Sequence, residues 1–139
     1  MKKIKKYWSF ILERRASFSF TVGSLSYGVY HFFNQYVLID SSSYEVINQF
    51  FGLLGGRSFG MVFIILSSTK LYGLITDKKY LKLPLYFALL FLWLLLALGF
   101  FIAFIFGTVN AAWIYSLIIA CLSTSILKPD TAVVKEDDV

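Results

Sequence analysis

The sequence predicts an all-α integral membrane protein, a bundle of four transmembrane helices forming one domain over residues 1–139, and three observations support this prediction. The first is composition, because 58% of the residues are hydrophobic and 15% are charged, whereas soluble domains carry about 45–50% and 25%. The second is a series of four long apolar runs separated by short polar turns. The third is the position of the basic residues, which flank these runs as they do in membrane proteins.

The N-terminal residues 1–15 predict a short amphipathic helix on the membrane surface. Ile4, Tyr7, Trp8 and Ile11 recur at helical spacing, and the basic residues occupy the other faces. This arrangement is typical of helices that lie on anionic lipid. The basic residues expected at this surface are Lys2, Lys3, Lys5, Lys6, Arg14 and Arg15.

The first predicted span covers residues 16–39 and contains no charged residue over its 24 positions. A helix needs about 20 apolar residues to cross a bilayer. Near its far end His31, Asn34 and Gln35 form a polar cluster at helical spacing. Because a metal site would need further His, Cys or carboxylate ligands, we expect an interfacial patch or an interhelical hydrogen bond there, rather than a metal site or a proton relay.

The segment after the first span predicts a turn followed by a short helix. Residues 40–45 have the Asp and Ser composition of turns, and the apolar residues of 46–54 share one helical face. Nine residues are too few to span, so we expect an interfacial or re-entrant helix that stops at two glycines. Its charged and aromatic residues offer a possible partner surface, formed by Asp40, Tyr44, Glu45 and Arg57.

The second predicted span covers residues 57–75 and contains Lys70. A lysine at the bilayer centre is costly, but Lys70 lies about seven residues from the next charged loop. We therefore expect its side chain to snorkel to the interface, with a buried functional lysine as the alternative. The polar run Ser67–Thr69 is expected to bond back to its own helix rather than to line a water path.

The third predicted span covers residues 83–106 and the fourth covers 111–127, with a tight turn between them and a polar tail at 128–139. Pro84 falls in the first turn of its helix, where its missing N–H is no loss. Lys78, Lys79 and Lys82 mark the loop between the second and third spans. With the N-terminus inside, 12 of the 13 basic residues are cytoplasmic and only Arg57 is outside, so we expect both termini in the cytoplasm.

Small residues at four-residue spacing predict close helix packing, because lipid provides no hydrophobic gain from helix contact. We expect the rows of the third and fourth spans to face each other as an antiparallel hairpin. The sequence leaves open whether the remaining contacts are internal, with another copy of the chain, or with another membrane protein. The rows comprise Gly56 and Gly60, then Gly99, Ala103 and Gly107, then Ala112, Ser116 and Ala120.

No motif for a reaction, a cofactor or a metal occurs in the sequence, so we expect a protein that is not an enzyme and binds no cofactor. A net charge of +5 could suggest nucleic-acid binding, but the charges flank apolar runs instead of forming a basic face. The central parts of the spans lack a carboxylate, which argues against an ion-coupled transporter.

The overall layout resembles small membrane proteins of bacteriophages and prophages. The shared features are the basic amphipathic start, the crowded apolar spans, the Ser-rich turn followed by a short helix, and the small charged tail ending Lys135-Glu-Asp-Asp138. Among such proteins the holins accumulate, assemble and open the cytoplasmic membrane, so the resemblance implies a holin-like role. Two alternatives remain open: a superinfection-exclusion or immunity protein that binds a partner, and a structural subunit of a larger membrane complex.

Overall fold

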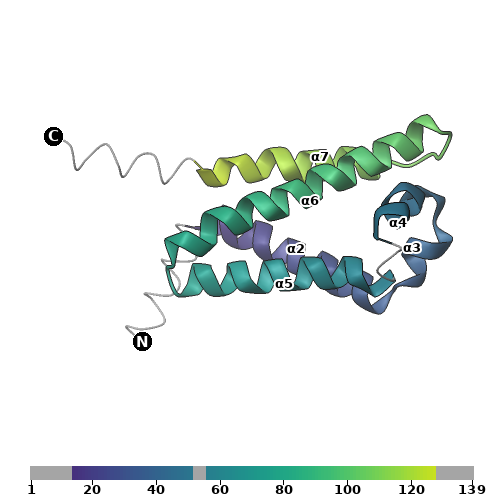
Figure 1. Cartoon of the computed structure of the whole chain (residues 1–139). Coiled ribbons are helices and arrows are strands. Elements are labelled where there is room, and N and C mark those ends of the chain that lie inside the picture. Colours follow the sequence, from purple (N-terminus) through teal and green to yellow (C-terminus); the bar gives the residue numbers. More distant parts are fainter. Residues whose placement is uncertain (1–13, 52–55, 128–139) are drawn as a thin grey trace.

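Helices make up nearly all of the described chain in the computed structural model, which describes residues 14–51 and 56–127 (Figure 1). The predicted N-terminal helix with Lys2, Lys3, Lys5 and Lys6, and the tail after residue 127, lie outside the described residues. The elements in chain order are α2 (Arg15–Phe33), α3 (Tyr36–Asp40), the 3-10 turn η1 (Ser42–Tyr44), α4 (Glu45–Phe51), α5 (Gly56–Ile75), α6 (Lys79–Ile105), α7 (Ala112–Ser123) and the 3-10 turn η3 (Thr124–Leu127).

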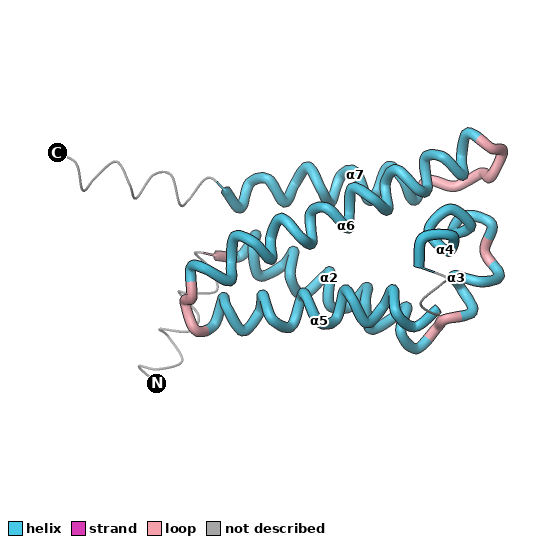
Figure 2. The backbone as a smooth tube through the Cα atoms, viewed as in Figure 1, coloured by secondary structure: helices cyan, strands magenta, loops and turns pink. Residues whose placement is uncertain are grey.

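The long helices lie side by side along one direction, and short elements cover one end (Figure 1). α2 packs along α5, α5 packs against α6, and α6 packs against α7. We call residues 36–51, which comprise α3, η1 and α4, the cap segment; it contacts α6 at the end where α6 turns into α7. Figure 2 shows the short turn between α5 and α6 at the opposite end.

The prediction of four transmembrane helices is wrong, because only two helices of the described chain are long and apolar enough to cross a membrane. These are Arg57–Ile75 and Lys79–Ile105. α2 ends at Phe33, not at residue 39, and carries many Ser, Thr, Tyr and Gly residues, so the absence of charge did not make it strongly apolar. α7 has 12 residues, about 18 Å of helix, which is shorter than a bilayer core of about 30 Å.

The outward face of α6 is an apolar stripe that fits a lipid environment. Phe87, Phe91, Leu94, Leu98 and Ile105 recur three, four or seven residues apart and are 45–64% exposed. Water-soluble proteins rarely expose continuous apolar surface of this extent. The stripe and the two candidate spans together are consistent with a membrane location.

The core is aromatic and lies where α2, α5 and α6 meet. Phe59 and Phe63 of α5 and Tyr86 and Trp93 of α6 are buried in one cluster. Phe63 packs edge-on against Trp93 with ring centroids 5.8 Å apart, a favourable geometry for aromatic pairs. These large rings pack α5 against α6 and form the apolar surface on which α2 lies.

α2 and α5 approach so closely at Gly28 and Gly60 that neither position has room for a side chain. A Cβ atom on Gly60 would meet the backbone nitrogen of Phe32 at 2.5 Å and the carbonyl oxygen of Gly28 at 2.7 Å. A Cβ atom on Gly28 would meet the Cβ of Phe63 at 2.7 Å. The sequence rows identified Gly60 as a packing residue, and its partner is Gly28 on α2.

The other small-residue rows have different environments. Ala103, Ser116 and Ala120 are buried and Ala112 is half-buried, while α6 and α7 lie side by side. Gly99, however, does not face α7, because a Cβ there would meet Ile47 of α4 at 2.8 Å. Gly107 has a φ of +99° with open space around it and makes the turn, and Gly56 is the first residue of α5.

Replacing Gly99 with leucine is therefore expected to displace the cap segment and to leave the α6–α7 contact in place. The new side chain would occupy the position of the Ile47 side chain, which is 1% exposed. Overpacking of this kind costs about 1–3 kcal/mol. Hydrogen exchange should become faster over residues 45–51 and stay unchanged over 112–123; faster exchange in α7 instead would restore the hairpin prediction for Gly99.

Candidate functional site: a buried polar seam

Lys70 is the centre of a polar seam between α2 and α5. Its side chain is 1% exposed, and its Nζ donates to the Oγ of Ser17 at 2.8 Å and to the Oγ1 of Thr21 at 3.2 Å. The prediction that Lys70 snorkels to the interface is wrong. The ammonium group is instead satisfied within the protein, because the close packing of α2 on α5 brings two hydroxyl groups within its reach.

The hydroxyl groups around Lys70 are oriented to accept hydrogen bonds. Thr21 donates its own proton to the carbonyl oxygen of Ser17 at 2.7 Å, which leaves its oxygen lone pairs for Lys70. No carboxylate lies within ion-pair distance of Lys70 in the described part of the chain. A charged ammonium group at this position is thus balanced by dipoles alone, which is an unusual and costly arrangement in a protein interior.

Ser67 extends the seam by one helical turn of α5. It is fully buried, and its Oγ makes no hydrogen bond to any described residue. Thr69, by contrast, donates to the carbonyl oxygen of Ile65 at 2.8 Å, as expected for a hydroxyl that bonds back to its helix. Buried hydroxyl groups are nearly always paired, so Ser67 is an exception. It lies on the same face of α5 as Lys70.

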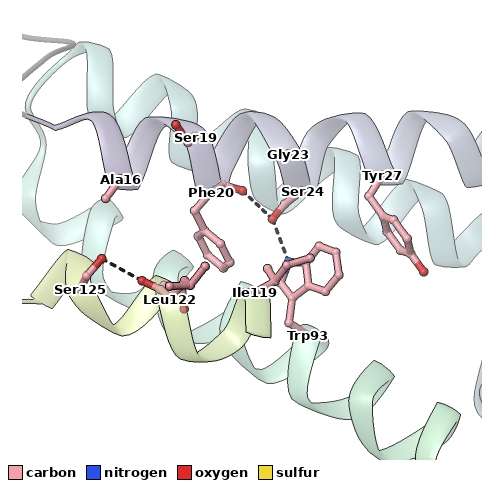
Figure 3. Close-up of a pocket in the computed structure, with 11 residues that line it drawn as sticks. Ala16, Ser19, Phe20, Gly23, Ser24, Tyr27, Trp93, Ile119, Leu122 and Ser125 are labelled. Atoms are coloured by element: carbon pink, nitrogen blue, oxygen red, sulfur yellow. Dashed lines mark hydrogen bonds between the residues drawn. The ribbon is translucent and has the colours of Figure 1, made fainter. Parts of the chain in front are cut away.

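Trp93 continues the seam toward the middle of the bundle. Its Nε1 donates to the Oγ of Ser24 at 2.9 Å, and Ser24 donates in turn to the carbonyl oxygen of Phe20 at 2.8 Å (Figure 3). The buried residues of α2 share one face of the helix, and this face is mainly polar. Its members are Ser17, Phe20, Thr21, Ser24, Gly28 and His31.

His31 joins α2 to the cap segment through a hydrogen-bond chain whose proton order is fixed. Its Nδ1 lies 3.0 Å from the carbonyl oxygen of Tyr27, which can only accept, so Nδ1 carries the proton in the neutral ring. Its Nε2 then accepts from the hydroxyl of Tyr44 at 3.0 Å. The Tyr44 oxygen accepts from the hydroxyl of Tyr27 at 3.1 Å. This is the predicted kind of hydrogen bond between separate helical segments.

The Tyr44 hydroxyl group points inward to Tyr27 and His31, so it is not available to a partner at the outer surface. Burial raises the pKa of Tyr44, so the group stays protonated and can donate to His31. Asp40, Glu45 and Arg57 are exposed, as a partner surface requires. Within the described residues, Glu45 and Arg57 form no ion pair with each other; the Arg57 guanidinium lies over the ring of Phe32, 5.8 Å from its centroid.

Replacing Tyr44 with phenylalanine is expected to loosen the cap segment. The change removes the donor to the His31 Nε2, and a buried acceptor without a donor costs about 1–3 kcal/mol. Proteolysis between residues 36 and 51 should become faster, while Tyr36→Phe, which alters an exposed hydroxyl bonded to Asn34, serves as the matched control. Equal protection of the two variants would show that the chain from Tyr27 to Tyr44 does not hold the cap.

The opposite end of the bundle carries most of the basic residues of the described chain, and we call it the basic end. Asp77 pairs there with Arg14 at 2.6 Å and with Lys82. These hydrogen bonds, from Lys82 first and Arg14 second, lower the pKa of Asp77 to about 2. The basic end comprises Arg14, Arg15, Lys78, Lys79 and Lys82.

The seam was only partly visible in the sequence. Lys70 and His31 were identified, but their partners are distant in the chain, since Ser17 and Thr21 lie 53 and 49 residues from Lys70. The available signal was the row of small and hydroxyl residues at three- and four-residue spacing in α2. No cluster of three metal-ligating residues occurs in the described part of the chain.

Comparison of the chain with protein-family models, with curated proteins and with solved structures gives no match. The arrangement of the seam itself is thus the basis for a functional assignment. A buried ammonium group, the two hydroxyl groups that accept from it and the unpaired Ser67 can hold a charge away from lipid and can present it to water if the helices separate.

Proposed function

We propose that this protein is a non-enzymatic membrane protein of phage or prophage type that permeabilises the membrane in a holin-like manner, through helix assembly. The observation that carries this proposal is the burial of Lys70 against hydroxyl groups alone. An ionisable residue inside a membrane helix is costly and is commonly functional. The polar seam between α2 and α5 gives the chain a surface that can line a water-filled lesion.

In the proposed mechanism α2 covers the seam in the single chain and leaves it in the assembly. When α2 separates from α5, Lys70 and the unpaired Ser67 become accessible on one face of α5. Lipid is an unfavourable environment for both groups, so the exposed faces of several copies turn toward a shared aqueous space. The assembly is therefore a homo-oligomer with α5 facing the lesion.

We further propose a multi-pass arrangement in the cytoplasmic membrane, with the basic end and both termini in the cytoplasm. The salt bridge from Arg14 to Asp77 brings the start of α2 to the turn between α5 and α6. The Tyr86 and Ser123 hydroxyl groups, 3.4 Å apart, bring the end of α7 toward the same side. The positive-inside rule then favours the cytoplasm for this end, where anionic lipids attract its basic residues.

A second candidate function is that of a superinfection-exclusion or immunity protein, and the cap segment favours it. Asp40 and Glu45 are exposed at the end of the molecule opposite the basic end. The cap is held to the bundle by the contact between Ile47 and Gly99 and by the bonds of Tyr44. With Arg57, this surface carries exposed charges of both signs, and it could bind a component of an incoming phage or toxin, or a subunit of a larger membrane complex.

Induced expression in a bacterial host, followed with a voltage-sensitive dye, tests the first proposal. The parent chain is expected to depolarise the membrane abruptly after a delay, and Lys70→Met is expected to accumulate in the membrane without depolarisation. Lys79→Met, which removes an exposed lysine of the basic end, is the matched control and should behave as the parent. Continued growth and an intact potential with the parent chain would rule out permeabilisation, and phage challenge would then test the second candidate.

A further inference from the structure

A groove of about 600 Å³ runs between α2 and α7 on the side of the bundle away from α5. One wall is α2, which projects the rings of Phe20 and Tyr27 toward the groove and leaves space at Ala16 and Gly23, and the other is α7 with Ile119 and Leu122 (Figure 3). A Cβ atom on Gly23 would meet nothing within 4 Å. The absence of a side chain at Gly23 thus leaves part of this wall open.

The walls of the groove suit an apolar occupant, because most of the polar groups that line it are already paired within the protein. Ser24 donates to Phe20 and accepts from Trp93. Ser123 donates to the carbonyl oxygen of Ala120, and Ser125 donates to that of Leu122. A polar ligand would find few free hydrogen-bonding groups here, whereas a hydrocarbon chain needs none.

The length of the groove matches one leaflet of a bilayer. Its wall on α2 extends from Ala16 to Tyr27, which is about 16 Å of helix. The hydrocarbon core of a bilayer is about 30 Å thick, so each leaflet contributes about half of that. One acyl chain of one leaflet can thus lie along the whole groove.

The charge at the mouth of the groove identifies the kind of lipid. Ala16 and Ser125 line the groove at the basic end, and the exposed Arg15 directly precedes Ala16. An arginine guanidinium binds phosphate oxygens in a bidentate manner. The positive charge of Arg15 favours an anionic headgroup over a zwitterionic one, because the cationic part of a zwitterionic headgroup is repelled by it.

We propose that this groove is a binding site for one acyl chain of an anionic phospholipid of the leaflet at the basic end, with Arg15 at the headgroup. The site depends on the membrane location of the protein and is independent of the proposed permeabilisation. It makes one lipid molecule part of the folded structure between α2 and α7.

Native mass spectrometry of the full chain in detergent, with added phosphatidylglycerol or phosphatidylcholine of identical acyl chains, tests this site. The parent is expected to retain one phosphatidylglycerol molecule. Gly23→Leu places a side chain in the groove and is expected to lower this binding about tenfold, whereas Gly23→Ala should have little effect. Arg15→Gln should remove the preference for phosphatidylglycerol, and Lys79→Gln, which removes the same charge outside the groove, should keep it.

Fluorescence gives a second readout that does not depend on the mass measurement. In a chain whose only tryptophan is Trp93, a lining residue of the groove, phosphatidylglycerol with brominated acyl chains should quench the emission at low mole fraction. Ser19→Phe should block the quenching as Gly23→Leu does, with helicity checked by circular dichroism. Parent-like lipid retention and quenching in both folded variants would overturn the proposal, as would a parent that retains no lipid. Either result leaves the permeabilisation assay unaffected.

Discussion

Replacing Lys70 with methionine is expected to raise the thermal stability of the protein, whereas the double change Ser17→Ala and Thr21→Val is expected to lower it. Methionine fills a similar volume without a charge, and replacing buried charged groups with apolar ones can stabilise a protein by about 1–4 kcal/mol. The double change leaves the Lys70 ammonium group without its two acceptors. Each hydrogen bond to a charged group contributes about 1.5–3 kcal/mol, so the loss of both should lower the stability clearly.

Thermal unfolding in one detergent, followed by circular dichroism, measures both effects. The triple variant combines Lys70→Met with Ser17→Ala and Thr21→Val, and its stability should be close to that of Lys70→Met alone. The two hydroxyl groups stabilise the fold by accepting hydrogen bonds from the Lys70 ammonium group, so their loss has little effect once that group is absent. Thr69→Val, which changes a hydroxyl of α5 bonded only to its own helix, controls for the loss of a threonine. A double change that leaves the midpoint where it was would show that the seam does not hold Lys70.

Replacing Gly60 with alanine is expected to force α2 away from α5 and to destabilise the fold by about 2 kcal/mol or more. The added Cβ would meet backbone atoms of Phe32 and Gly28, and backbone cannot rotate away as a flexible side chain can. Because the same contact positions Ser17 and Thr21, the change is also expected to weaken the hold on Lys70. A lower unfolding midpoint and faster hydrogen exchange over residues 15–33 are the expected observations.

Gly23→Ala is the matched control for this prediction. Gly23 is on the same helix as Gly28 and has open space around its Cβ position. Alanine has the higher helix propensity by up to about 1 kcal/mol, so Gly23→Ala should leave the midpoint unchanged or raise it slightly. If Gly60→Ala were as stable as Gly23→Ala, the close approach of α2 and α5 would not be important for the fold.

The helical class and the positions of α5 and α6 could be predicted from the sequence, because long apolar runs bounded by basic residues are a strong local signal. The number of spans could not be predicted, because a long run without charge is not necessarily apolar enough to cross a membrane. α2 shows the difference: it has no charge after Arg15, yet hydroxyl groups occupy much of its buried face. A hydroxyl group is neither charged nor apolar, so the sequence alone does not show whether it points into the protein or outward.

The candidate site was harder to predict, because its partners are joined by the fold and not by the sequence. A charged loop lies about seven residues from Lys70, so its side chain was expected to reach the interface. Its partner Ser17 is 53 residues away in the chain, and no local pattern indicated it. The partner of Gly99 was likewise hidden, since spacing shows which helix face is small but not which neighbour lies against it. For Gly60 the spacing identified the right residue, because the close approach of α2 and α5 requires that position to have no side chain.

The concentration of positive charge at one end of the molecule affects how closely copies can crowd in a membrane. Copies inserted in the same direction place Arg15, Lys78 and Lys79 of neighbours at the same depth, so they repel one another there. The repulsion decays over about 8 Å at physiological ionic strength, and anionic lipids that gather between the copies reduce it further. Lateral spacing is therefore expected to depend on the salt and lipid composition on that face, which links the density of the protein in the membrane to conditions in the surrounding cell.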